Sequence, residues 1–158
     1  MDDEKLSNLA VDQIKKEKSK LIEEFASTSA YLSEEIPISL FMAGSPGAGK
    51  TEVSKTLINR FNQKPVRIDA DEIREMCEGY TGKNSSIFQR ASDKGVNFLF
   101  DHCIKHKLNF ILDATFAYGG VAENIHRCLE HKRQVQIFFV YQDPKKAWIF
   151  TKLREIEQ

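Results

Sequence analysis

The stretch Gly44-Ser-Pro-Gly-Ala-Gly-Lys-Thr51 matches the phosphate-binding P-loop pattern G-x-x-x-x-G-K-[ST] at every specified position. Its glycines allow the backbone to turn so tightly that successive N–H groups can point at one anion. Lys50 adds a positive charge at the β- and γ-phosphates, and Thr51 offers a hydroxyl to Mg²⁺. All eight residues are therefore predicted to form a nucleotide site: Gly44, Ser45, Pro46, Gly47, Ala48, Gly49, Lys50 and Thr51.

The sequences on either side of this loop have the character that the motif requires. Ile36–Ala43 is a short, mostly apolar run, as expected for a strand that is buried on both faces. Apolar residues at helical spacing follow the loop, namely Val53, Leu57, Ile58 and Phe61. A strand, the loop and a helix in this order predict that phosphate binds at the start of the helix, where the helix dipole is positive.

The composition is that of one ordinary soluble domain. The 158 residues are 41% hydrophobic and 29% charged, and the formal net charge is zero. No dense tract of lysine and arginine lies outside the N-terminal segment. This balance disfavours a polyanionic partner such as duplex DNA but is compatible with a small nucleotide.

The cysteines and the start of the chain predict a cytoplasmic protein. Cys77, Cys103 and Cys128 are odd in number and lack C-x-x-C spacing, so reduced thiols are expected. The opening Met-Asp-Asp-Glu-Lys is wrong for a signal peptide. No apolar run approaches the roughly 20 residues that span a bilayer, so no membrane partner is expected.

Two segments are distinguished by their patterns. Residues 1–35 carry a partial helical stripe and predict one or two N-terminal helices. From residue 36 onward strands and helices alternate: strands are expected at 36–43, 66–69, 109–114 and 135–141, and helices after the P-loop and at 71 onward, 85–105, 120–129 and 144 onward. The fold class is therefore α/β, a P-loop kinase-like parallel sheet with helices on both faces in residues 36–158.

Carboxylates stand at or just past the ends of two predicted strands. Ligands of such sheets bind beyond the carboxyl ends of the strands. Asp71 is the candidate catalytic carboxylate, which would accept or orient the proton of a substrate hydroxyl, and its alternative role is a helix N-cap. Asp69 could hold a water of Mg²⁺, but capping is favoured there. Asp113 resembles the acidic residue that helps to hold Mg²⁺, and the alternative is a polar turn after a buried strand.

Phosphoryl transfer needs positive charge beyond Lys50. Arg154 is the preferred candidate, because it lies on the helix after the fourth strand, where a lid could close. The other arginines considered are Arg74, Arg90, Arg127 and Arg133. His102 and His106 stand one helical turn apart, but the remaining ligands of a zinc site are missing, so a plain helix face is favoured.

Four stretches together resemble the zeta-toxin family over about residues 36–156. They are the P-loop, Ile68-Asp-Ala-Asp-Glu-Ile-Arg74, Asn109-Phe-Ile-Leu-Asp-Ala-Thr115, and Asp143-Pro-x-x-Ala-Trp148 followed by Arg154-Glu155. This family consists of P-loop kinases of toxin–antitoxin systems that phosphorylate the sugar 3′-hydroxyl of UDP-N-acetylglucosamine. The resemblance implies ATP and Mg²⁺ as cofactors, a UDP-sugar as substrate and an antitoxin as partner.

The resemblance also implies roles for individual residues. Lys50 and Thr51 would bind ATP and Mg²⁺, Asp71 would be the catalytic base, Thr115 would lie at the sugar-nucleotide site, and Arg154 would contact phosphate. Asn97 falls near the position where better-known toxins carry a substrate-binding glutamate. Residues 1–35 could be a tethered counterpart of an inhibitory antitoxin helix, or a packing helix at the edge of the sheet.

Besides Asn97 in place of the glutamate, the chain departs from the family in its length. Family members continue beyond the position of Gln158, and a second arginine and further substrate contacts lie in that part. We therefore expect an incomplete kinase domain, explained by a fragment, by a naturally short protein, or by a half-domain that another chain completes.

The leading hypothesis is thus a kinase that transfers the γ-phosphate of ATP to a sugar hydroxyl, with UDP-N-acetylglucosamine as the favoured acceptor. The alternatives are a nucleotide-binding but catalytically incomplete interaction module, and a kinase with another acceptor such as a polynucleotide 5′-hydroxyl. A regulatory GTPase is disfavoured, because the sequence has no N-K-x-D motif.

Overall fold

The computed structural model describes residues 2–114 and 116–157, with the backbone alone for residues 154–157. In chain order the elements are α1 (Asp3–Lys16), α2 (Lys18–Ala26), β1 (Ile38–Ala43), α3 (Lys50–Leu57), the 3₁₀ turn η1 (Ile58–Arg60), β2 (Val66–Asp69), α4 (Ala70–Glu75), α5 (Gln89–Lys105), β3 (Phe110–Asp113), α6 (Val121–Glu130), β4 (Gln134–Phe139) and α7 (Pro144–Glu157).

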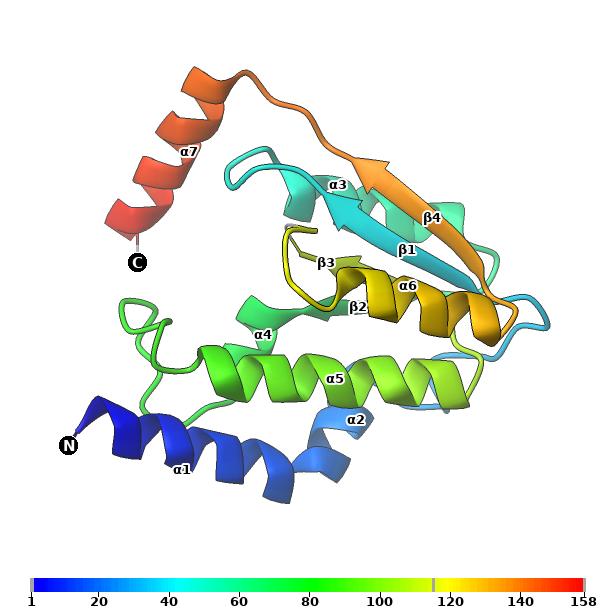
Figure 1. Cartoon of the computed structure of the whole chain (residues 1–158), viewed down its shortest axis with the longest axis horizontal. Helices are drawn as coiled ribbons and strands as arrows, with labels where there is room; N and C mark the ends of the chain where they lie inside the picture. Colours follow the sequence, from blue (N-terminus) through cyan, green and yellow to red (C-terminus); the bar gives the residue numbers. More distant parts are fainter. Residues whose placement is uncertain (1, 115, 158) are drawn as a thin grey trace.

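The strands form one parallel sheet in the order β2-β3-β1-β4. Helices α5 and α6 lie over one face of this sheet and α3 lies over the other (Figure 1). The predicted fold class is therefore confirmed. Because all strands run in one direction, the loop after β1, the start of α4 and the end of β3 meet at one edge of the sheet (Figure 1). Asp69 and Asp113 are register partners there.

The alternation of side chains along the strands builds an apolar core on each face. On the α5 side, Phe41, Phe110 and Leu112 belong to the larger cluster of buried residues. On the α3 side, their neighbours Leu40 and Ile111 belong to a smaller cluster, packed against apolar residues of α3 and η1. Burial on both faces explains why these strands read as continuous apolar runs.

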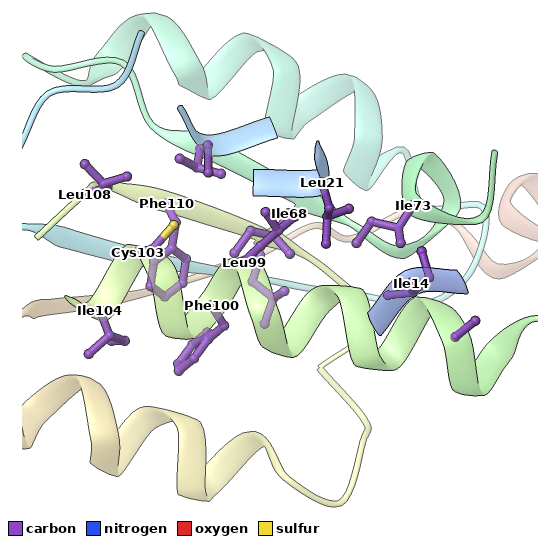
Figure 2. Packing of buried hydrophobic residues seen from close by; sticks show 14 of the residues in the cluster. Ile14, Leu21, Ile68, Ile73, Leu99, Phe100, Cys103, Ile104, Leu108 and Phe110 are labelled. Atoms are coloured by element: carbon purple, nitrogen blue, oxygen red, sulfur yellow. The ribbon is translucent and has the colours of Figure 1, made fainter. Parts of the chain in front are cut away.

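The N-terminal helices α1 and α2 contribute to the larger core. Ile14 of α1 and Leu21 of α2 are fully buried. They share one cluster with Ile73 and Leu99, as Figure 2 shows from close by. These helices lie along α5, on the side of α5 that faces away from α6 (Figure 1). The apolar stripe of residues 1–35 is therefore a packing surface of the domain core.

Helix α5 begins at Gln89, four residues later than predicted. The N–H groups of Ile87 and Phe88 donate to carbonyls three residues earlier, at 3.1 and 3.2 Å, so tighter turns precede the helix. The apolar residues Ile87 and Phe88 lie in these turns, directly before the helix, which is why the sequence pattern placed the start too early. Within residues 2–114 and 116–157, none of the helices combines the length and the apolar character that a bilayer crossing requires.

Candidate functional site

The P-loop connects β1 to α3 at the carboxyl edge of the sheet. Gly47 and Gly49 have φ angles of 74° and 89°, in the left-handed region that favours glycine. Gly49 directly precedes α3, whose first residue is Lys50. Thr51 lies in the first turn of α3. The loop thus presents its backbone and a helix N-terminus to one point, as a phosphate site requires.

The side chain of Lys50 folds back over the loop. Its Nζ donates to the carbonyl oxygen of Gly44 at 2.9 Å and to that of Ser45 at 2.7 Å. These contacts place the ammonium group above the turn, where the motif needs a positive charge. Polyphosphate oxygens would be stronger acceptors than neutral carbonyls, because charge-assisted hydrogen bonds are the stronger ones.

Helix α7 packs directly against the P-loop. A Cβ atom at Gly47 would lie 2.1 Å from the carbonyl oxygen of Ala147 and 2.7 Å from Oγ1 of Thr151. Ala147 is 4% exposed. The last helix therefore covers one side of the loop, and this close approach is a second reason for glycine at position 47.

A cavity of about 630 Å³ opens at the same edge of the sheet. Its lining brings together three predicted site residues, Asp71, Asn97 and Asp113, from α4, α5 and the end of β3. Arg74 and Arg127 also line it. The cavity is connected to the P-loop helix, because Oδ2 of Asp113 lies 2.7 Å from the hydroxyl of Ser54 in α3.

Asp71 projects into this cavity from the first turn of α4. Its side chain is 72% exposed and pairs with the guanidinium of Arg74, of which only 10% is exposed. The alternative role of Asp71 as an N-cap is wrong. Asp69 is the N-cap, and its Oδ1 accepts from the Asp71 N–H at 2.9 Å. Asp69 satisfies the helix start, so the Asp71 carboxylate remains directed at the cavity.

The charged centre of this edge is Arg67 of β2, which sequence reasoning did not single out. Its guanidinium pairs with Asp69, with Glu72 and, at 2.8 Å, with Oδ2 of Asp113. Its Nε also donates to the Ser54 hydroxyl at 3.1 Å. One buried cation therefore links β2, α4, β3 and α3.

Burial and charge oppose each other in this network. Burial lowers the pKa of Arg67, but the hydrogen bond to Asp113 and the three carboxylates outweigh it, so the pKa is raised. Burial raises the pKa of Asp69 from its ordinary value, while the Asp71 N–H and Arg67 act against this. Arg67 therefore remains a cation and holds the carboxylates in place.

Protein side chains at this edge of the sheet could supply only some of the ligands of a Mg²⁺ ion. Thr51 stands in the first turn of α3, as the motif requires. Oδ2 of Asp113 is already engaged by Ser54 and Arg67, and the Asp113 side chain is 4% exposed. The described residues contain no group of three or more His, Cys, Asp or Glu side chains that could hold a metal ion. A Mg²⁺ ion here would need most of its ligands from phosphate and water, as is usual for this ion.

The other candidates divide into placed and unplaced residues. Nε2 of His102 lies 3.0 Å from the Ala26 carbonyl oxygen, so this ring joins α5 to α2. Arg133 is buried and donates to backbone carbonyls, including that of Leu108, so it serves the fold. Thr115 lies outside the described residues. The backbone of Arg154 belongs to α7, but its side chain lies outside the description.

Comparison with known proteins identifies the family. The family model described as Zeta toxin matches residues 22–158, which is most of the chain. The chain belongs to the zeta-toxin family. It is 25% identical over 130 residues to the toxin PezT of Streptococcus pneumoniae, covering 77% of this chain and 51% of PezT. Over a shorter stretch of 65 residues it is 37% identical to the HslU ATPase subunit of an ATP-dependent protease from Petrotoga mobilis, covering 40% of this chain and 13% of HslU.

The fold is also that of a solved relative. A chain from the structure of the PezAT chromosomal toxin–antitoxin system of Streptococcus pneumoniae superimposes with a TM-score of 0.79 at 19% identity. The match covers 92% of this zeta-toxin family chain and 63% of the solved chain. Thus the chain spans about half the length of PezT and less than two thirds of the solved chain.

Proposed function

We propose that this zeta-toxin family chain is a phosphotransferase that moves the γ-phosphoryl group of ATP to a hydroxyl group of a small molecule. The observation that carries the proposal is the juxtaposition at one sheet edge of the P-loop and the cavity that contains Asp71. The two are joined through Asp113 and Ser54, which are 2.7 Å apart. A donor site next to an acceptor site is the arrangement that phosphoryl transfer requires.

On the donor side, residues 44–51 would hold the phosphates of ATP. The left-handed glycines and the N-terminus of α3 supply N–H donors, and Lys50 supplies the charge at the β- and γ-phosphates. Mg²⁺, when bound, would neutralise phosphate charge, with Thr51 as a protein ligand and Asp113 holding one of its waters. Arg154 would add a second cation from α7, which already contacts the loop at Gly47.

On the acceptor side, Asp71 would act as the general base. Its carboxylate would accept the proton of the acceptor hydroxyl as the oxygen attacks the γ-phosphorus. The bond between that phosphorus and the bridging oxygen then breaks, and ADP leaves with the electron pair. The exposed carboxylate of Asp71 is accessible for this role.

The acceptor that we propose to test first is UDP-N-acetylglucosamine. The chain belongs to the zeta-toxin family, and the cavity offers an amide at Asn97 to bind a sugar hydroxyl. Thr115, two residues after Asp113, is proposed as a further substrate contact. A polynucleotide 5′-hydroxyl is the alternative acceptor.

An antitoxin is the proposed protein partner, because the similar solved chain comes from a toxin–antitoxin system.

The second candidate function, a binding role without catalysis, is favoured by the exposed apolar surface of the chain. Strand β4, the segment after it and helix α7 expose large apolar side chains, namely Phe139 in β4, Tyr141 in the connecting segment and Trp148 in α7. Exposed apolar patches of this kind mark interaction surfaces.

A product assay tests the proposal. The chain is incubated with ATP, Mg²⁺ and a panel of UDP-sugars, free sugars and a 5′-hydroxyl oligonucleotide, and phosphorylated products are detected by mass spectrometry. We expect one phosphorylated sugar product from the wild type and none from Lys50→Ala. Nucleotide binding by calorimetry without any product would contradict the proposal and favour the interaction module.

A further inference from the structure

Arg74 occupies an unusual position beside the proposed base. Its side chain is 10% exposed, whereas that of its partner Asp71 is 72% exposed. One terminal nitrogen donates to Oδ1 of Asp71, and the other donates to Oε1 of Gln89 at 2.5 Å. The Nε atom is buried and makes no hydrogen bond within the described part of the chain. The guanidinium is therefore held rigidly, with its two terminal nitrogens committed to two partners.

The partners of Arg74 are themselves oriented. Nε2 of Gln89 donates to Oδ1 of Asp93 at 2.7 Å. This contact fixes the amide of Gln89 so that its oxygen faces Arg74, because only the amide nitrogen can donate to a carboxylate. The four side chains form a directed row of hydrogen bonds from α5 to α4, and all of them line the cavity.

The energetic pattern argues against a simple stabilising ion pair. Burying a guanidinium carries a desolvation cost, so a pair between a nearly buried arginine and an exposed carboxylate is weak evidence for a stabilising role. Asp71 lies in the first turn of α4, and its side chain is largely exposed. The nearly buried guanidinium of Arg74 reaches back and holds one oxygen of this exposed carboxylate.

We propose that Arg74 is the positioning residue for Asp71, and that Gln89 and Asp93 keep Arg74 in its orientation. This inference rests on the proposed function, in which Asp71 receives the hydroxyl proton. With Oδ1 held by Arg74, the second carboxylate oxygen is directed at the cavity. Misplacement of a reacting group by about 1 Å can cost about 100-fold in rate. Because Asp71, Arg74, Gln89 and Asp93 line the cavity and not the P-loop, we expect this row of hydrogen bonds to affect turnover rather than ATP binding.

The test measures acceptor-dependent turnover of Arg74→Ala, Arg74→Lys and Gln89→Ala, with Arg90→Ala as the matched control. Arg90 is an exposed arginine of α5 that donates to Asn8. We expect Arg74→Ala to lower kcat about 10- to 100-fold with little change in the KM for ATP. Arg74→Lys should fall in between, because one ammonium cannot serve two partners in a fixed geometry. Gln89→Ala should lose about 3- to 10-fold, and the Arg74→Ala, Gln89→Ala double variant should be no worse than Arg74→Ala alone.

Chemical rescue separates positioning from a merely structural role. Added guanidinium, at concentrations that leave the wild type folded, should restore part of the kcat of Arg74→Ala and none of that of Asp71→Asn. If the wild type turns over and a folded Arg74→Ala matches it, or if Gln89→Ala has full activity and guanidinium rescues nothing, this inference alone is overturned. If the wild type shows no acceptor-dependent turnover at all, the proposed function falls and this inference falls with it.

Discussion

At the scale of single residues, Arg67 is the side chain on which the site edge depends most. It is 9% exposed and neutralises Asp69, Glu72 and Asp113, two of which are themselves nearly buried. Removal of one partner of a buried ion pair leaves an uncompensated charge, which typically costs about 3–5 kcal/mol.

We therefore predict that Arg67→Met lowers the free energy of unfolding by about 3 kcal/mol or more. Urea unfolding followed by circular dichroism measures this change. The exposed Arg90→Met serves as control and should stay within about 0.5 kcal/mol of the wild type. An Arg67→Met protein as stable as the control would show that the carboxylates do not need this cation.

Much of the site could be predicted from residue patterns, but Arg67 could not. The P-loop is recognisable by its motif, and the carboxylates Asp71 and Asp113 are recognisable by their positions at the ends of predicted strands. Arg67 stands inside the strand Val66-Arg-Ile-Asp69, where an arginine reads as a solvent-facing residue. The signal in the sequence that could have identified Arg67 was the presence of carboxylates at positions 69, 72 and 113, with which it pairs. Only the register of β2 with β3 brings the last of these to Arg67.

At the scale of elements, the contact between α4 and α5 depends on Gly95. A Cβ atom there would lie 2.6 Å from Cγ2 of Ile73, which is fully buried. Alanine normally stabilises a helix interior by about 0.5–1 kcal/mol over glycine. Overpacking a core costs about 1–3 kcal/mol, and here this effect should win.

We accordingly predict that Gly95→Ala destabilises the protein by about 1–2 kcal/mol. The control is Gly119→Ala, since a Cβ at Gly119 meets nothing within 4 Å. Thermal unfolding of both variants compares the two sites directly. A Gly95→Ala variant more stable than the wild type would mean that α4 moves aside without cost.

The contact between α2 and α5 through His102 should make the stability of the protein depend on pH. Burial lowers the pKa of His102 from its ordinary value of 6.5, and the neighbouring His106 lowers it further, while the hydrogen bond to Ala26 opposes this. The unfolded chain therefore takes up this proton first as the pH falls. The contribution of His102 to stability is present above pH 6.5 and is lost as the pH falls through the lower pKa of the folded state.

His102→Gln keeps a donor for the Ala26 carbonyl but cannot titrate. Between about pH 7.5 and about pH 5.5, we predict that Tm falls less in this variant than in the wild type. The difference should be small, because the ring is only partly buried. An equal fall of Tm with pH in the two proteins would contradict the lowered pKa of His102.

At the scale of the whole molecule, the N-terminal helices belong to the core of the domain. Ile14 and Leu21 are fully buried in the cluster that contains Leu99 and Phe110 (Figure 2). The sequence pattern predicted these helices but left their role open between an inhibitor and a packing layer. Helical periodicity marks an apolar face and does not say what that face covers.

We predict that deletion of residues 1–26 abolishes cooperative unfolding or causes aggregation, because it uncovers this cluster. Circular dichroism melts and size-exclusion chromatography measure the outcome. A folded deletion variant with raised kinase activity would instead support a tethered inhibitor.

In the proposed function, the P-loop binds the nucleotide and Asp71 acts on the acceptor, at two separate parts of one sheet edge. The most direct measurement compares the wild type with Asp71→Asn, using calorimetry for ATP binding and acceptor-dependent ADP formation for turnover. We predict that Asp71→Asn binds ATP as tightly as the wild type and loses about 100- to 10,000-fold in turnover. Undiminished turnover in Asp71→Asn would contradict the proposed role of Asp71 as the general base.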